Sequence, residues 1–412
     1  ADAGQVIFTP PGSTQYAYRY GPAILIDGDR IDIWASAPPL VSNGVRYGND
    51  SIEYIRSTDG GKTWTEWKTV LYPTLNSEDQ WSTCDPGAFK YGDYYYVGYT
   101  GSPEFRTNPD KEKQVNNLFI ARAKNPEGPY EKWNGNGWGG DPYAITRYSG
   151  DGVGCSMPSF TVKGDTLYMY YVDQTHPDQD WNSEGNISVS TFSLKDPNWP
   201  GNELSNKMCE NKPEEVRYCP DIDKFIGFQL KGGWDYDSYV EIYESTDGVN
   251  FTKTSSFRNN FPHYAHNIGI SGNNLGQLDL SIQNYIGTAY TPTGVEAWWG
   301  HWHTQLIPLY IREERPSSTT SSQPSGSTDS SSRKPTTSSV GSTDGESSET
   351  EVSEPQNSNI ESTVSDDKDK DKEVNNKTEQ QEETSYLWLY IVIGAVVVLA
   401  GAGTAVYFLV IK

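Results

Sequence analysis

The sequence has little cysteine, little histidine and little positive charge. Only 4 Cys and 5 His occur among its 412 residues, so the fold needs no dense disulfide scaffold. The 55 acidic side chains outnumber the 32 Lys and Arg side chains, which gives a formal net charge of -23. No basic stripe offsets this charge, and the repulsion of phosphate groups argues against a nucleic-acid partner.

The chain also lacks the short motifs of nucleotide and zinc sites. It contains no P-loop, CxxC or HExxH segment, so nucleotide binding and zinc chemistry are poor interpretations. His301 and His303 have the spacing that puts two imidazoles on one face of a strand. Because a third ligand is missing, we predict no metal site there. The sequence requires no cofactor. Whether a structural calcium ion occupies a central channel stays an open question.

The four cysteines allow two interpretations. Cys209 and Cys219 are ten residues apart around a predicted loop, and Cys84 and Cys155 open successive repeats. Either pair can form a disulfide in an extracellular protein. The alternative is that all four are small buried thiols.

A repeated hairpin pattern dominates the first three quarters of the chain. Residues 81–100 predict two strands joined by a tight turn, and the pattern returns at 21–35, 156–171, 214–228 and, with more glycine, 266–290. Three of the turns are Gly-Asp, flanked by β-branched and aromatic residues, which is a hairpin signal. Repeats spaced by roughly 45–70 residues indicate blades of a propeller.

Each repeat is followed by further strand-like segments, so we expect four strands in every blade. Residues 5–9 predict an isolated strand that closes a sheet with the last one, 304–311. The prediction is therefore an all-β, five-bladed β-propeller over residues 1–314. Between strands, residues 57–64 read STDGGKTW and residues 245–251 read STDGVNF. In both, the Asp is expected to bond turn amides, Gly to supply positive φ, and the aromatic ring to tuck under the hairpin.

The last hundred residues predict a different organisation. Residues 315–385 are rich in Ser and Thr and then acidic, with few apolar residues, so we expect a disordered stalk. Residues 386–411 are an uninterrupted apolar run, followed only by Lys412. That run is long enough for one transmembrane helix. We therefore predict a single-pass protein of the cell membrane whose propeller is extracellular.

Several motifs resemble those of known propeller enzymes. Asp85-Pro86, followed by a Gly-Asp turn and a Tyr-rich strand, and the later segment KNPEGPYEKW at 124–133 look like blades of the five-bladed glycosidases of families 43 and 32. The segments at 57–64 and 245–251 resemble the Asp-box turns of sialidases. The resemblance covers about residues 16–311 and implies glycoside hydrolysis. In those glycosidases the Asp-Pro aspartate usually lies in blade one, whereas blade one here has Gly21-Pro22.

Candidate site residues follow from where the innermost strands of a propeller begin, since those ends converge on one funnel. There, we predict Asp85 and Glu215 as a catalytic carboxylate pair, with Glu215 as the acid and Asp85 ionised. Asp85 precedes a proline, which predicts an extended backbone, and Arg19 or Arg217 is expected to orient it. The predicted substrate-binding residues are Arg19, Tyr20, Trp81, Arg217, Tyr218 and His266, with Trp234 as a further stacking candidate.

Structural interpretations of the same residues stay open. Asp85 can simply bond neighbouring amides, and Glu215 can be an ion-pair partner of Arg217. Weaker loop candidates are Glu104, Asp151, Asp173 and His176.

The sequence thus favours a cell-surface-anchored glycoside hydrolase that acts on extracellular oligo- or polysaccharides. The alternative is a non-catalytic carbohydrate-binding or adhesive propeller, which the missing blade-one aspartate supports. The sugar, the linkage and the oligomeric state stay open.

Overall fold

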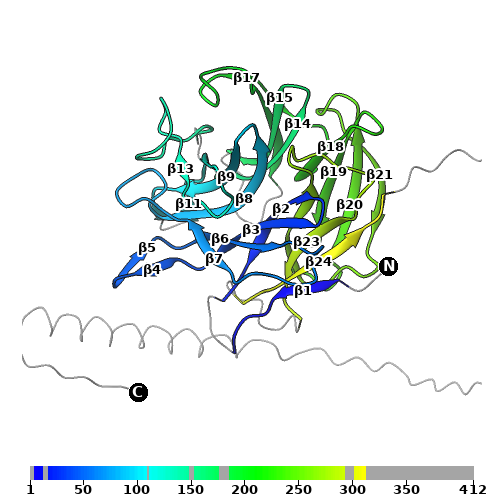
Figure 1. Ribbon diagram of the computed structural model, residues 1–412, viewed down its shortest axis with the longest axis horizontal. Coiled ribbons are helices and arrows are strands. Elements are labelled where there is room, and N and C mark those ends of the chain that lie inside the picture. Colours follow the sequence, from blue (N-terminus) through cyan, green and yellow to red (C-terminus); the bar gives the residue numbers. More distant parts are fainter. Residues whose placement is uncertain are drawn as a thin grey trace, which may run out of the picture. The chain divides into compact units, whose positions relative to one another are not determined.

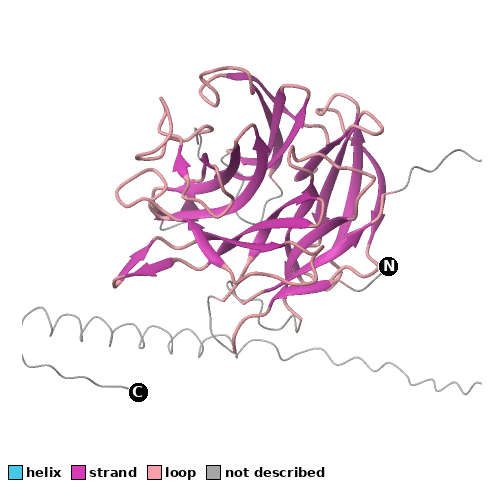
Figure 2. Ribbon diagram, in the orientation of Figure 1, coloured by secondary structure: helices cyan, strands magenta, loops and turns pink. Residues whose placement is uncertain are grey.

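The structure is a computed structural model that describes residues 4–12, 17–108, 111–147, 153–175, 185–292 and 301–311 (Figure 1). Within these ranges the regular elements are 24 β-strands, and no helix occurs (Figure 2). No helix in the described part of the chain is long and apolar enough to span a membrane. The predicted stalk, 315–385, and the predicted transmembrane helix, 386–411, lie outside the described residues.

Most of the strands belong to five groups of four, each antiparallel and ordered from a first strand to a fourth. Group one is β2 (Tyr20–Asp27), β3 (Arg30–Ala37), β6 (Ser51–Ser57) and β7 (Lys68–Leu71); group two is β8 (Ser82–Tyr91), β9 (Tyr94–Ser102), β12 (Asn117–Ala123) and β13 (Glu131–Lys132). Group three is β14 (Gly154–Lys163), β15 (Thr166–Gln174), β16 (Asn186–Ser193) and β17 (Glu203–Met208). Group four is β18 (Glu215–Cys219), β19 (Lys224–Lys231), β20 (Tyr239–Ser245) and β21 (Thr252–Phe257); group five is β22 (Ala265–Gly272), β23 (Asn284–Tyr290), β24 (His303–Leu309) and β1 (Gln5–Phe8). Two extra hairpins, β4 (Leu40–Ser42) with β5 (Val45–Tyr47) and β10 (Phe105–Asn108) with β11 (Lys111–Gln114), were not predicted.

The predicted hairpins are confirmed at the start of every group. β2 pairs with β3, β8 with β9, β14 with β15, β18 with β19 and β22 with β23. The three Gly-Asp turns hold Gly28, Gly92 and Gly164 at φ of 62°, 58° and 63°. Only glycine adopts this left-handed conformation without steric cost, which explains why the sequence places it there.

The groups pack side by side in a closed circle. A separate hydrophobic cluster lies between each pair of neighbours: one and two, two and three, three and four, four and five, and five and one. The first strands of groups one and five also pair directly, in parallel, at Ile24 with Ser271 and Leu25 with Gly272. Figure 1 shows the sheets arranged around the first strands. This arrangement brings side chains from distant parts of the chain to one centre.

The predicted closing strand is also confirmed. β1 pairs antiparallel with β24, with Gln5 opposite Leu306. In Figure 1 the two strands, dark blue and yellow, lie next to each other. The beginning and the end of the described chain therefore complete a single sheet.

Glycine is required where the first strands of groups five and one touch. A Cβ atom at Gly269 would overlap the backbone carbonyl of Pro22. We expect Gly269→Ala to lower the free energy of unfolding by about 2–3 kcal/mol, because the two backbones must separate. At Gly137 a Cβ would meet nothing within 4 Å, so Gly137→Ala should change stability by less than about 0.5 kcal/mol. Denaturant unfolding of both variants checks this, and equal stability of the two would contradict it.

The two turn segments have the hydrogen bonds that their residues predict. Asp59 accepts from the Thr63 amide at 2.9 Å and from its hydroxyl at 2.6 Å, and these bonds lower the pKa of Asp59 to about 2. Asp247 accepts from the amides of Val249 and Asn250. Both turns lie between a third and a fourth strand. They therefore fix strand connections, and their chemistry is explained by structure.

The open question about the cysteines is answered. Cys84, Cys155, Cys209 and Cys219 are all free and buried. The disulfide interpretation is therefore wrong, and the four side chains act as small hydrophobic residues.

Candidate functional site

Four of the five first strands begin with the same distortion. A β-bulge occurs between Tyr20 and Ala23, Cys84 and Gly87, Ser156 and Ser159, and His266 and Ile268. Inside each bulge one residue has left-handed φ: Gly21 at 56°, Asp85 at 48°, Met157 at 57° and Asn267 at 58°. For the three non-glycine residues this conformation costs roughly 1–3 kcal/mol, and such outliers gather at functional sites. The prediction of an extended Asp85 is wrong, because the bulge overrides the preference of a residue before proline.

The distortion brings three of these residues together at the centre of the circle. The Asn267 side-chain amide donates to Asp85 Oδ1 at 3.2 Å. A Cβ atom on Gly21 would lie 3.5 Å from both of these side-chain atoms. Asp85 belongs to group two, Gly21 to group one and Asn267 to group five, so their contact confirms that the strand entrances converge.

Asp85 is held by groups from several strands. Its backbone N–H donates to the Ser36 hydroxyl at 2.7 Å, and its carboxyl lies 3.5 Å from Cys84 Sγ. Thr100 also hydrogen-bonds the carboxyl. The side chain is therefore fixed in place, and the residue as a whole is partly exposed.

A second carboxylate near Asp85 was not predicted. Asp50 precedes β6 and is only 4% exposed. Its Oδ1 accepts a hydrogen bond from the Tyr18 hydroxyl at 2.5 Å and its Oδ2 accepts one from Ser82 at 2.8 Å. Desolvation by burial raises the pKa of Asp50, and these hydrogen bonds oppose the rise.

Burial and a neighbouring like charge both raise the pKa of Asp85. Burial raises the pKa of Asp85 from its ordinary value of 3.8 to about 6, and repulsion from the Asp50 carboxylate adds to the effect. Hydrogen bonds from Cys84, Thr100 and Asn267 act in the opposite direction. A carboxyl with this pKa can hold and release a proton near neutral pH.

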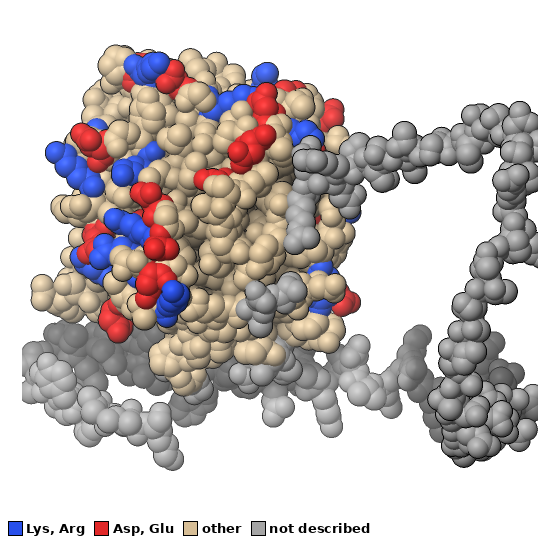
Figure 3. Space-filling model, turned by 45° about the vertical axis from the view of Figure 1, so that its right-hand side comes forward, with Lys and Arg blue, Asp and Glu red and all other residues tan. Residues whose placement is uncertain are grey.

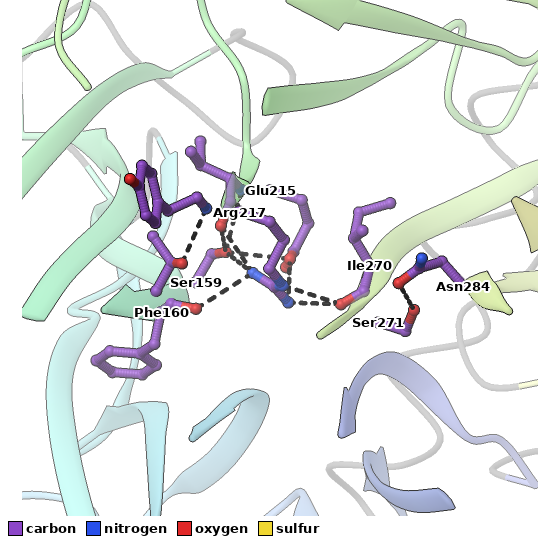
Figure 4. A network of polar contacts seen from close by, with 10 residues as sticks. Ser159, Phe160, Glu215, Arg217, Ile270, Ser271 and Asn284 are labelled. Carbon is purple, nitrogen blue, oxygen red and sulfur yellow. Dashed lines mark hydrogen bonds and ion pairs between the residues drawn. The ribbon is translucent and has the colours of Figure 1, made fainter. Parts of the chain in front are cut away.

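Glu215 forms an ion pair that joins three first strands (Figure 4). Its Oε2 lies 2.9 Å from Arg217 Nη2 and accepts a hydrogen bond from Ser159 at 3.1 Å. Arg217 also donates to the Ile270 carbonyl at 2.6 and 3.1 Å and to Ser159 Oγ at 2.6 Å. Desolvation raises the pKa of Glu215, and the charge of Arg217 opposes this rise. The interpretation of Glu215 as the partner of Arg217 is therefore confirmed.

The predicted orientation of Asp85 by arginine is wrong. In the described part of the chain, neither Arg19 nor Arg217 bonds Asp85. Arg19 Nη2 lies 2.5 Å from Glu53, and its guanidinium lies 4.6 Å from the ring centre of Phe8. Both arginines instead neutralise glutamates, so among the described residues neither of them opposes the rise that burial and Asp50 cause in the pKa of Asp85.

An aromatic cluster lies beside Asn267. Its rings pack closely, with 4.3 Å between the centres of Trp234 and His266, 4.3 Å between His266 and Trp302, and 5.3 Å between Tyr20 and Trp302. Burial lowers the pKa of His266 to about 3, so this imidazole is neutral. Tyr20 and Trp302 are fully buried, whereas Trp234 is 39% exposed. Trp234 therefore presents a surface on which a sugar can stack, and Tyr20 does not.

The remaining candidates lie in less central places. Trp81 is partly exposed and its backbone N–H bonds the Ser102 carbonyl. The Tyr218 hydroxyl donates to Asp223 at 2.7 Å in the turn after β18, which is the end opposite Glu215, so its predicted place at the entrance is wrong. Among the loop candidates, Glu104 is exposed and Asp173 bonds Thr175 and Ser188, while Asp151 and His176 lie outside the described residues.

The described residues contain no cluster of three or more metal-ligating side chains. The predicted absence of a metal site at His301 and His303 stays a prediction.

The sequence signal that could have identified Asp50 was its position directly before the third strand of group one. The corresponding positions before β12, β16 and β20 are Asn116, Gly185 and Ser238.

No protein-family model and no curated protein sequence matches this chain. Several solved structures share its fold. A family 117 glycoside hydrolase from the marine bacterium Zobellia galactanivorans matches with a TM-score of 0.52 and 15% identity, over 74% of this chain and 89% of the other. The catalytic domain of a family 62 α-L-arabinofuranosidase from Coprinopsis cinerea matches with a TM-score of 0.50 and 12% identity, over 74% of this chain and 96% of the other.

A family 62 hydrolase in complex with xylotriose also matches, with a TM-score of 0.50 and 9% identity, over 73% of this chain and 94% of the other. These identities are too low to carry function, but the coverage is broad. The all-β chain described here therefore shares the fold of β-propeller glycoside hydrolases.

Proposed function

We propose that the entrance around Asp85 hydrolyses a glycosidic bond in an oligo- or polysaccharide. The observation that carries the proposal is Asp85, which lies at the convergence of three groups, is partly exposed as a residue and has its pKa raised to about 6. In this proposal each group of four strands is one blade of a five-bladed propeller. The family 62 structure with xylotriose adds support, since a protein of this fold binds an oligosaccharide.

The contacts of the two carboxyl groups support the opposite of the roles expected from the sequence, with Asp85 rather than Glu215 as the acid. Within the described residues no cation pairs with Asp85, and its pKa is raised, so it suits the general acid that protonates the leaving oxygen. Glu215 is paired with Arg217 at 2.9 Å, and the charge of Arg217 opposes the rise that burial causes in the pKa of Glu215. Glu215 is therefore assigned as the carboxyl group that acts together with Asp85. Asp50 does not touch the substrate in this scheme. It acts as a positioning residue whose charge raises the pKa of Asp85.

Substrate recognition is assigned to the exposed face of Trp234. The indole stands against His266, which immediately precedes the Asn267 that bonds Asp85. A sugar stacked on Trp234 would therefore lie close to the acid. Neutral glycans suit this arrangement because the side chains at the entrance are carboxylates, aromatic rings and an amide.

The test is hydrolysis of a panel of arabinosylated and unsubstituted xylo-oligosaccharides by the whole chain. Release of reducing sugar from at least one member is expected. The second candidate function is binding without hydrolysis, which the ion pairing of Glu215 and the glycine at position 21 favour. Affinity for a panel member together with no turnover at any pH from 4 to 8 would support that alternative.

We further propose that the enzyme is held on the cell surface through residues 386–411. The basis is the length of that apolar run, which exceeds the requirement of a bilayer core of about 30 Å. The full chain should partition into the detergent phase, and a chain that ends at residue 385 should stay in the aqueous phase. Equal partitioning of the two would contradict the anchor.

A further inference from the structure

A basic cavity lies between groups one and two, at the end of the strands opposite Asp85. Its volume is about 450 Å³, within the range of roughly 300–1,000 Å³ that is common for small-molecule pockets. Group one contributes Arg30, Arg56 and Lys68, and group two contributes Lys90 and Lys124. Asp93 and Glu127 are the acidic residues that line it.

Two N–H donors of the cavity's arginines have no hydrogen-bond acceptor among the described residues. Arg30 Nε donates to Asp32 at 2.8 Å, but its Nη2 is buried without a hydrogen-bond partner. Arg56 Nη1 pairs with Glu127 at 3.0 Å, but its Nε is likewise buried without a partner. Buried donors of this kind cost free energy unless an acceptor is supplied. Both belong to guanidinium groups, which bind oxyanions through paired N–H donors.

The lysines add positive charge that the described residues do not neutralise. Lys68, Lys90 and Lys124 form no ion pair within the described part of the chain. Lys90 Nζ lies 5.0 Å from the ring centre of Tyr95, and Lys124 Nζ lies 6.0 Å from that of Tyr94. The cluster is unusual in a chain with a net charge of -23. On the face drawn in Figure 3, acidic and basic side chains are instead interspersed.

We propose that the basic cavity binds a tetrahedral oxyanion of the sulfate or phosphate class, at a site separate from Asp85. The oxyanion would be held by the guanidinium groups of Arg30 and Arg56, which line the cavity, and the lysines would neutralise its charge. The cavity is larger than a lone ion needs, so an ester on a sugar is also accommodated. The inference concerns binding alone and does not depend on hydrolysis at the entrance.

The test is thermal unfolding of the whole chain at constant ionic strength, with sodium chloride as the reference salt. Inorganic sulfate or inorganic phosphate at ten times its dissociation constant should raise Tm by about 3 °C. Glucose 6-sulfate and glucose 6-phosphate distinguish an ester from a free ion, because glucose itself should give no shift. Tighter binding of the sugar esters than of the free ions would assign the site to an anionic saccharide.

Variants separate the cavity from general charge effects. The double variant Lys68→Gln/Lys90→Gln should weaken oxyanion binding at least tenfold in calorimetry. The matched variant Lys163→Gln/Lys195→Gln removes two surface lysines paired with Asp223 and Asp165 and should bind like the wild type. Arg56→Lys, which keeps the charge but loses the guanidinium fork, should weaken binding by a smaller factor. Equal shifts with chloride, or unchanged binding in the first double variant, would overturn the proposal.

Discussion

Asp85→Asn is expected to lower kcat on a hydrolysed glycan by about 1,000-fold or more, because the substitution removes the proton donor and little else. Asn has the size of Asp and is the non-glycine residue that best tolerates positive φ, so the backbone at 48° is kept. The wild-type rate should fall about tenfold per pH unit above pH 6, as the carboxyl ionises. Steady-state kinetics from pH 4 to 8 check both results.

Although Asp85→Asn should lower activity, it should raise the stability of the protein at pH 7. A carboxyl whose pKa is raised on folding stabilises the protein fully below its ordinary pKa of 3.8, and this contribution is lost as pH rises through about 6. At pH 7 the ionised Asp85 therefore costs roughly 3 kcal/mol, and Asn avoids that cost. Asp165→Asn, on an exposed turn, is the control and should retain activity. A less stable Asp85→Asn with normal activity would contradict the role assigned to Asp85.

Arg217→Met is expected to lower the free energy of unfolding by about 3–5 kcal/mol, because it leaves the Glu215 charge buried without its partner. It also removes two hydrogen bonds to the Ile270 carbonyl and one to Ser159. The expected fall in Tm is about 10 °C. Differential scanning calorimetry at pH 7 measures it directly.

Two further variants test whether the buried ion pair is the cause. Arg217→Met/Glu215→Leu removes both charges and should regain most of the lost stability, because no buried charge is left unpaired. Lys224→Met breaks a pair with Glu244 in which both side chains are more than a third exposed and should cost less than about 1 kcal/mol. If Arg217→Met unfolds like the wild type, the ion pair does not hold the three first strands together.

The hairpins could be predicted because their signals are local. Gly28, Gly92 and Gly164 supply the backbone conformation of a tight turn, and apolar residues on both sides supply the strands. The pairing of β1 with β24 was also predictable, since two unmatched strands remained at the two ends of the repeat series. The small hairpins β4–β5 and β10–β11 interrupt groups one and two and lack the repeated pattern.

The site was harder to predict because its properties come from contacts between strands. The rule for a residue before proline describes an isolated chain, whereas the backbone of Asp85 is set by a bulge against β9. Asp50 resembled an ordinary residue before a strand, and its importance arises from Tyr18 and Ser82, each 32 residues away. The ion pair between Arg217 and Glu215 could be predicted as one alternative, because the two residues lie two positions apart on the same strand.

The pairing of β1 with β24 has a consequence for biosynthesis. The last sheet cannot be completed until residue 309 has been translated, so the circle of sheets stays open while the earlier hairpins already form. Joining residue 311 to residue 4 by a short linker and starting the chain at 44, in the exposed β4–β5 turn, would make β1 and β24 neighbours in sequence. In such a circular permutant the long-range closure moves from β1 and β24 to the pairing of β3 with β6, so group one becomes the last sheet to be completed.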